Sequence, residues 1–171
     1  NYKVSGGLHG VGMAVVCALS ENLIATSRRD GFEWRQTYSR GEPTTKITKE
    51  KPTRNYGTTI YFKPDGQIFP KTEFNPKLIL ERAESKAFLN KGLKIIVNEN
   101  KNTHLFHYPD GIQDYIKKIV GKKDTLMEKP FYVEKEDKNL KLETAFLWTP
   151  STDTQILSFA NSIRTIDGGT H

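Results

Sequence analysis

Four glycines within seven positions, placed directly before a short apolar stretch, constrain this chain more than any other feature. They stand at positions 6, 7, 10 and 12 of the segment YKVSGGLHGVG, residues 2–12, and the nearly all-apolar residues 11–19 predict a short helix. Glycine reaches backbone conformations that other residues avoid, so successive N–H groups can converge on one point. Unpaired N–H groups at a helix N-terminus attract anions. The segment therefore predicts a phosphate-binding loop in which His9 donates a hydrogen bond, with a tight flexible connection as the alternative.

Two familiar phosphate-binding patterns do not fit this segment. The pattern GxxxxGK[ST] requires a lysine followed by serine or threonine after its last glycine, and neither follows Gly12. The dinucleotide pattern GxGxxG has its glycines in another order, since this loop reads GxxGxG. The predicted loop thus belongs to another class of nucleotide-binding protein.

Strand and helix patterns alternate irregularly along the rest of the chain. Asp30-Gly31 is a preferred two-residue turn, and it predicts a hairpin of residues 23–29 and 32–40. Further strands are expected at residues 44–48, 58–62, 93–97, 104–108, 131–134, 140–148 and 155–163, with residues 49–56 as a polar stretch and helices at 76–89 and 110–120. Strands grouped with a few helices indicate an α+β fold, with a domain boundary near residues 122–130.

Composition excludes several kinds of site and partner. The single cysteine, Cys17, excludes an internal disulfide and a multi-cysteine metal site. His104 and His107 lie three apart on an expected strand, so they point to opposite faces and no metal site is expected. No apolar run is long enough to span a membrane, so a soluble protein is expected. The net charge of +6 favours polyanionic partners, although acidic residues are interspersed among the lysines.

Residues 2–12 resemble the ATP-lid signature of gyrase B subunits and their topoisomerase IV counterparts, within the gyrase/histidine-kinase/MutL ATPase superfamily. The resemblance continues at residues 18–20, 38–41, 57–58, 88–90 and 159–171, and therefore covers essentially the whole chain. It implies an α+β fold in which residues 1–125 are the C-terminal part of a two-layer ATP-binding domain. Residues 126–171 would begin an α/β transducer domain.

The resemblance also implies roles for individual residues. Tyr2 would reach the adenine side of ATP, and the lid would close over the triphosphate. Thr58 would help to hold adenine through a water, and Arg29 corresponds to an arginine that contacts coumarin antibiotics. The implied nucleotide-binding set is Tyr2, Lys3, Gly7, Leu8, His9, Gly10, Val11, Gly12 and Thr58.

Departures from the family pattern limit what this chain is expected to do alone. After the last lid glycine stands Met13-Ala14-Val15-Val16-Cys17 where the family usually has Val-Ser-Val-Val-Asn, and packing changes on the helix are the expected result. A start at Asn1 without methionine predicts an internal piece of a longer protein. The family's catalytic glutamate, its Mg²⁺-binding asparagine and its adenine-binding aspartate would lie upstream, so no catalytic or metal-binding residue is expected here. ATP hydrolysis would need those residues as well.

The implied activity is ATP binding and hydrolysis coupled to dimerisation of the ATPase domain and to DNA strand passage. Implied partners are a gyrase A subunit and duplex DNA, with Mg²⁺ as a cofactor and no membrane. Location would be the bacterial cytoplasm, at the nucleoid, or a plastid-type organelle. Two alternatives stay open, a topoisomerase IV ATPase subunit and a catalytically inactive nucleotide-sensing module. An intact upstream set of glutamate, asparagine and aspartate would favour the enzyme over the sensing module.

Overall fold

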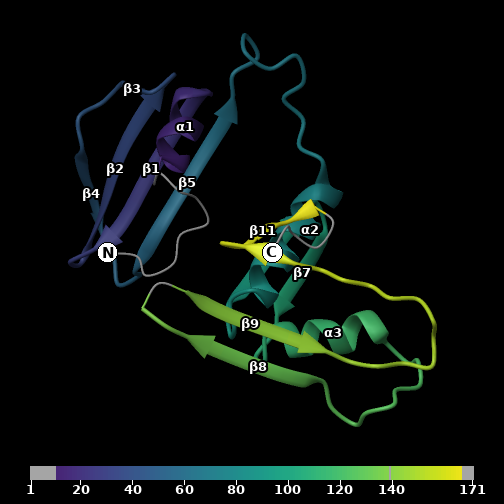
Figure 1. Cartoon of the computed structure of the whole chain (residues 1–171). Coiled ribbons are helices and arrows are strands. Elements are labelled where there is room, and N and C mark those ends of the chain that lie inside the picture. Colours follow the sequence, from purple (N-terminus) through teal and green to yellow (C-terminus); the bar gives the residue numbers. More distant parts are fainter. Residues whose placement is uncertain (1–10, 139, 167–171) are drawn as a thin grey trace. The chain divides into compact units, whose positions relative to one another are not determined.

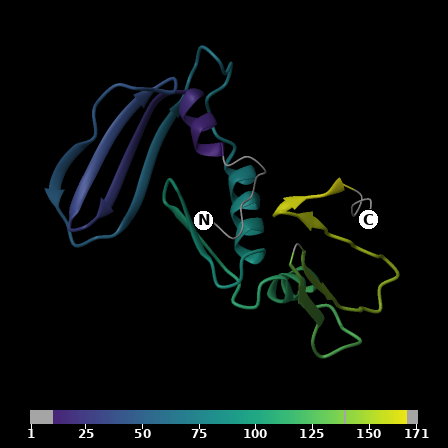
Figure 2. The ribbon, with the colours of Figure 1, turned by 60° about the vertical axis from the view of Figure 1, so that its left-hand side comes forward.

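The computed structural model describes residues 11–138 and 140–166 of the chain. These residues form two compact units, Asn1–Phe74 and Asn75–His171, and Figures 1 and 2 show the elements of each. Helices and antiparallel strands occur in both, which confirms the predicted α+β fold. Within the described residues, no helix is long and apolar enough to cross a membrane.

The first unit is an antiparallel sheet with one short helix. Its strands are β1 (Ser20–Arg29), β2 (Phe32–Ser39), β3 (Glu42–Pro43), β4 (Thr48–Pro52) and β5 (Gly57–Pro64). Their order is β3-β2-β1-β5, with β4 also paired to β2. Positive φ angles of 54° at Asp30 and 80° at Gly31 let the chain reverse within two residues, so the predicted hairpin is confirmed.

Helix α1 (Gly12–Ala18) lies over the end of this sheet where β1 begins (Figure 1). Ser20 Oγ donates to Val16 O at 2.6 Å and joins the helix to the strand. Leu23, only 3% exposed, stands directly opposite Phe62 of β5, and Phe62 lines a cavity with Val15 of α1. Directly opposed residues share a sheet face, so α1 covers the face that carries Leu23 and Phe62.

A buried carboxylate fastens the same end of the sheet. Asp65, 1% exposed, accepts a hydrogen bond from Arg40 Nε and another from the backbone N–H of Gln67 at 2.9 Å. Its own N–H donates to Leu19 O, and the Arg40 N–H donates to Ser20 O. The hydrogen bond from Arg40, followed by that from Gln67, holds the pKa of Asp65 below its usual range. Ionised Asp65 therefore ties together the ends of α1, β2 and β5.

We expect Asp65→Asn to lower the stability of the protein above pH 4 and to flatten its acid dependence. A carboxylate whose pKa is depressed on folding stabilises the protein above its unfolded pKa of about 3.9, and this stabilisation is lost as the pH falls through the folded pKa. Thermal unfolding midpoints between pH 2 and pH 7, followed by circular dichroism, measure the effect. Glu42→Gln, at an exposed carboxylate of β3, is the matched control. Equal pH slopes for the parent and for Asp65→Asn would contradict the assignment.

The second unit begins with α2 (Pro76–Phe88), whose N-cap Asn75 accepts a side-chain hydrogen bond from the Leu78 N–H at 3.3 Å. The hairpin of β6 (Lys94–Glu99) and β7 (Asn102–His107) packs beside α2 (Figure 2). Then follow α3 (Ile112–Val120) and a second hairpin, β8 (Phe131–Glu136) with β9 (Lys141–Phe146).

Phe88, 2% exposed, stands at the centre of this unit. Its ring stacks on Tyr115 of α3 at a centroid distance of 3.7 Å and meets Tyr108 and Phe159 edge-on at 6.2 and 5.6 Å. Four aromatic rings from separate segments thus form one packed cluster, which joins α2 to α3 and to the strand that contains Phe159.

Two expected strands were placed wrongly. Residues 44–48 do not form a strand, because Thr37 engages Thr44 and Thr45 through hydroxyl and backbone hydrogen bonds; the strand is β4, Thr48–Pro52, in the stretch expected to be irregular. Residues 155–163 form only the short pair β10 (Phe159–Ala160) and β11 (Ile163–Arg164). Positive φ angles at Asn161 and Ser162 reverse the chain there. The expected helices and remaining hairpins are confirmed, within a few residues at their ends.

Candidate functional site

The helix N-terminus that follows the glycine-rich loop carries no side-chain cap. Val11, the N-cap residue of α1, makes no side-chain hydrogen bond, and the first turn holds no acidic residue. Gly12 is exposed, and a Cβ placed on it would meet no atom within 4 Å. This end of α1 is therefore open to an anion, although the helix is only seven residues long. The other predicted loop residues lie outside the described residues: Tyr2, Lys3, Gly7, Leu8, His9 and Gly10.

The structure brings the other two predicted residues, Thr58 and Arg29, to one face of the sheet. Thr58 stands opposite Ser27, and the register between β1 and β5 is regular there. Ser27 and Arg29 are two positions apart on β1, so they share a face with Thr58. Leu23 lies on the same face four positions before Ser27. One face thus carries α1 over its first end and exposed Thr58 and Arg29 at its other end.

Arg28, the neighbour of Arg29, points to the opposite face. There it donates to Thr59 Oγ1 at 2.8 Å and pairs with Glu33 at 2.8 Å. Arg29 pairs only with the adjacent Asp30 among its described neighbours, at 3.0 Å, and both of these side chains are exposed. Arg29 can therefore turn toward a ligand on the Thr58 face at little cost, because an exposed ion pair contributes little to stability.

An apolar cavity of about 250 Å³ lies between α1, β5 and residues 68–74. Its walls include Leu19 of α1, Phe62, Phe69 and Phe74, and the rings of Phe62 and Phe74 meet edge-on at 5.7 Å. Neither Thr58 nor Arg29 lines it. It is a packing space under the helix and is separate from the residues predicted to bind the nucleotide.

Residues 11–138 and 140–166 contain no group of three or more His, Cys, Asp or Glu side chains that could hold a metal ion. His104 of β7 is half-buried while His107 is exposed, in agreement with their expected opposite faces. These residues therefore do not form a Mg²⁺ site.

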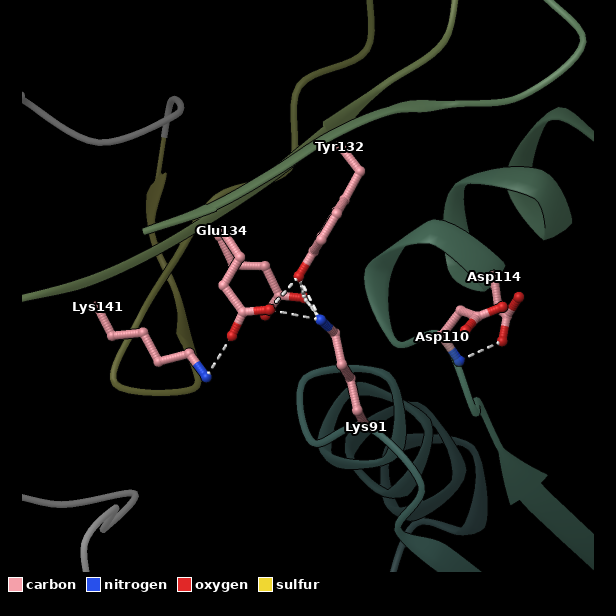
Figure 3. Close-up of polar contacts among 7 residues, drawn as sticks. Lys91, Asp110, Asp114, Tyr132, Glu134 and Lys141 are labelled. Atoms are coloured by element: carbon pink, nitrogen blue, oxygen red, sulfur yellow. Dashed lines mark hydrogen bonds and ion pairs between the residues drawn. The ribbon is translucent and has the colours of Figure 1, made fainter. Parts of the chain in front are cut away.

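A polar cluster that sequence patterns gave no sign of joins the end of α2 to the hairpin β8–β9 (Figure 3). We call it the Lys91 cluster, and it consists of Lys91, Tyr132, Glu134, Lys141 and Glu143. Lys91 Nζ lies 2.8 Å from Glu134 Oε2 and 3.3 Å from Glu143 Oε1, and it donates to the Tyr132 hydroxyl. That hydroxyl donates to Glu134 at 2.6 Å and to Glu143 at 3.0 Å. Lys141 Nζ lies 2.7 Å from Glu134 Oε1.

The pKa values within the Lys91 cluster show that its charges stabilise one another. Hydrogen bonds from Lys141, Lys91 and Tyr132 lower the pKa of Glu134 to about 2. Burial and the hydrogen bond to Glu134 raise the pKa of Tyr132 to about 12. Desolvation lowers the pKa of Lys91, but its hydrogen bonds to Glu134 and Tyr132 and the charge of Glu143 outweigh that effect and raise it. At neutral pH, Lys91 and Glu134 are both charged.

Comparison with known protein families identifies relatives over the whole chain. The sequence model described as DNA gyrase B matches residues 111–171. The DNA gyrase B protein of Clostridium acetobutylicum is 40% identical over 99% of this chain and 27% of its own length. The B protein of DNA topoisomerase 4 from Bacillus subtilis is 42% identical over 99% of this chain and 26% of its own length. The chain spans about a quarter of the length of these relatives.

Solved structures show the same fold. The 43K ATPase domain of Thermus thermophilus gyrase B, solved in complex with an aminocoumarin, matches with a TM-score of 0.84 at 32% identity. The match covers 91% of this chain and 44% of that one. The B-subunit of the DNA gyrase from Myxococcus xanthus matches with a TM-score of 0.82 over 90% of this chain and 46% of that one; at 24% identity this match supports the fold alone.

Proposed function

Because the chain belongs to the DNA gyrase B family, we propose that it is part of the ATP-hydrolysing subunit of a type IIA DNA topoisomerase. The observation that carries this proposal is the close structural match to a gyrase B ATPase domain over nine-tenths of the chain. The open α1 N-terminus and the sheet face with Thr58 agree with a nucleotide site assembled partly from this chain.

In this proposal the chain binds ATP and positions it. Backbone N–H groups of Leu8, His9, Gly10, Val11 and Gly12 bind the phosphate oxygens, and Tyr2, Lys3 and Gly7 complete the lid. Thr58 lies on the sheet face beneath and helps to hold adenine. Such groups act by presenting fixed dipoles to the charge that develops during phosphoryl transfer.

Two further components of the reaction fall to residues other than those described here. Hydrolysis requires a general base and Mg²⁺, which neutralises charge on the phosphates when it is bound. The described residues do not fit a Mg²⁺ site, so we assign no ligand to them and propose that both components come from other parts of the subunit.

The proposal includes partners and a location. ATP binding would favour dimerisation of two ATPase domains, and a gyrase A subunit would supply the DNA-cleaving part of the assembly. The net charge of +6 is compatible with a partner as strongly acidic as duplex DNA. The relatives named above are bacterial, so we place the protein beside the bacterial chromosome, with a plastid-type organelle as the alternative.

The test is ATP turnover by the intact subunit, measured with and without its partner subunit and DNA. DNA-stimulated hydrolysis together with ATP-dependent supercoiling would support a gyrase. Decatenation without supercoiling would favour a topoisomerase IV, an alternative that the Bacillus subtilis relative keeps open. Nucleotide binding without hydrolysis would overturn the enzyme and favour a nucleotide-sensing module.

Arg29 provides a separate test of the site, because we propose that it contacts coumarin antibiotics. We expect Arg29→Gln to weaken aminocoumarin binding by about 10-fold, the loss of one charged hydrogen bond, while the thermal midpoint stays unchanged. Isothermal titration measures the affinity. Arg35→Gln is the matched control, because Arg35 pairs with Thr26 and therefore lies on the opposite face. Equal losses in the two variants would argue for a general charge effect and against a contact at Arg29.

A further inference from the structure

The Lys91 cluster connects parts of the chain that stand on either side of the domain boundary expected near residue 125. Lys91 follows α2 in a turn where Asn90 Nδ2 donates to Lys86 O and the Gly92 N–H donates to Tyr108 O. Tyr132, Glu134 and Glu143 belong to the hairpin β8–β9. A single side chain from the earlier part therefore reaches three polar side chains of the later part.

The position of Lys91 is fixed before it reaches the hairpin. A Cβ on Gly111 would lie 2.7 Å from Lys91 Cγ and 3.2 Å from Phe88 O, so the lysine stem packs against a residue that must be glycine. Gly111 also has a φ of 60° and a ψ of −123°, a conformation that other residues avoid. Holding the stem in one place lowers the entropy that the ammonium group loses when it binds the carboxylates.

Lys91 differs from the other lysine of the cluster in what it joins. Lys141 and Glu134 lie on the two strands of one hairpin, so their ion pair stabilises the hairpin internally. Lys91 bonds to the same carboxylate from outside the hairpin, and Nζ also lies 4.4 Å from the centre of the Tyr132 ring. Helix α3 packs against β9 as well, so the hairpin has an apolar contact along which it can move and a charged contact that selects one position.

We propose that Lys91 is a positioning residue that couples the ATP-binding part of the protein to the hairpin β8–β9, and this inference rests on the proposed function. The ion pairs are between about one-fifth and one-third exposed, so they are screened and reversible contacts, unlike those of a buried core. Displacement of the turn after α2 moves Nζ away from Glu134 and Glu143 and releases the hairpin. Lys91 binds no nucleotide in this scheme, and it acts by holding the hairpin in register with α2.

The experiment compares four forms of the intact subunit: the parent, Lys91→Met, Lys91→Arg and Lys141→Met. Methionine keeps the stem beside Gly111 but removes the charge, whereas arginine keeps both. Lys141→Met removes the same charge from the same carboxylate without touching the link to α2. Hydrogen exchange of the β8–β9 amides reports docking, and ATP turnover and DNA strand passage with the partner subunit report coupling.

We expect Lys91→Met to speed exchange in β8–β9 about 5-fold, as for a networked ion pair. Strand passage per ATP hydrolysed should fall about 5-fold with the KM for ATP unchanged, as for other coupling residues. Lys91→Arg should restore both, and Lys141→Met should leave coupling intact. Unchanged exchange in Lys91→Met, equal effects in both methionine variants, or faster exchange with normal coupling would each overturn the proposal. If the parent hydrolyses no ATP, the proposed function fails, while the exchange comparison still decides whether Lys91 holds the hairpin.

Discussion

The double variant Gly10→Ala, Gly12→Ala should lose ATP turnover by at least ~100-fold while the protein stays folded. Removal of one preorganised backbone or side-chain donor at a developing charge commonly lowers the rate by about 10²- to 10³-fold, and two methyl groups in the lid would keep several N–H groups from the phosphates. At Gly12 the fold itself tolerates a methyl group, because no atom lies within 4 Å of the position its Cβ would take. Loss of activity would therefore report the missing ligand contact and not misfolding.

Gly66→Ala is the matched control for this experiment. Gly66 lies in the same unit, and a Cβ there would also meet no atom within 4 Å. Steady-state ATP turnover with DNA and partner subunit measures the effect, and the thermal midpoint verifies the fold. Turnover in the lid variant within a few-fold of the Gly66→Ala variant would show that the glycine-rich loop does not close over the triphosphate.

Local patterns in the sequence predicted most of the secondary structure, because they depend on near neighbours. The Asp30-Gly31 turn gave the register of the first hairpin, and Asn75 with Pro76 gave the start of α2. The strand at Thr48–Pro52 was missed because its residues are polar and wholly exposed, so they show no alternation. Its pairing with β2 is accompanied by Lys49 over the Phe32 ring at 3.4 Å, a contact that no local pattern announces.

The candidate site was only partly predictable for a related reason. Glycine spacing marked the lid directly, but the shared face of Thr58 and Arg29 depends on the register between β1 and β5. The Lys91 cluster was missed altogether, because its members lie up to 52 positions apart, from Lys91 to Glu143, and each alone resembles a solvated charge. Such a cluster depends on tertiary packing, which one sequence does not reveal.

Phe88→Ala is expected to destabilise the second unit by about 3–5 kcal/mol, the usual cost of removing a buried phenylalanine ring. The side chain is 2% exposed and contacts three other rings, so its loss leaves a cavity between α2, α3 and the strand of Phe159. Total stabilities of domains are about 5–15 kcal/mol, so this change removes a large share. The chain has two tryptophans, Trp34 in the first unit and Trp148 in the second. Urea unfolding in a Trp34→Phe background therefore follows the second unit through Trp148 alone.

The control for Phe88→Ala is Phe131→Ala, which removes a ring that is 44% exposed and stacked on Phe146 at 4.5 Å. Its expected cost is about 1 kcal/mol, since an aromatic pair contributes about that much beyond area burial. If both variants shifted the Trp148 transition equally, Phe88 would be one contact among many. A much larger shift for Phe88→Ala would establish that the aromatic cluster holds α2 in place. The Lys91 cluster needs that support, because Lys91 lies only three residues beyond Phe88 and can reach β8–β9 only from a fixed helix end.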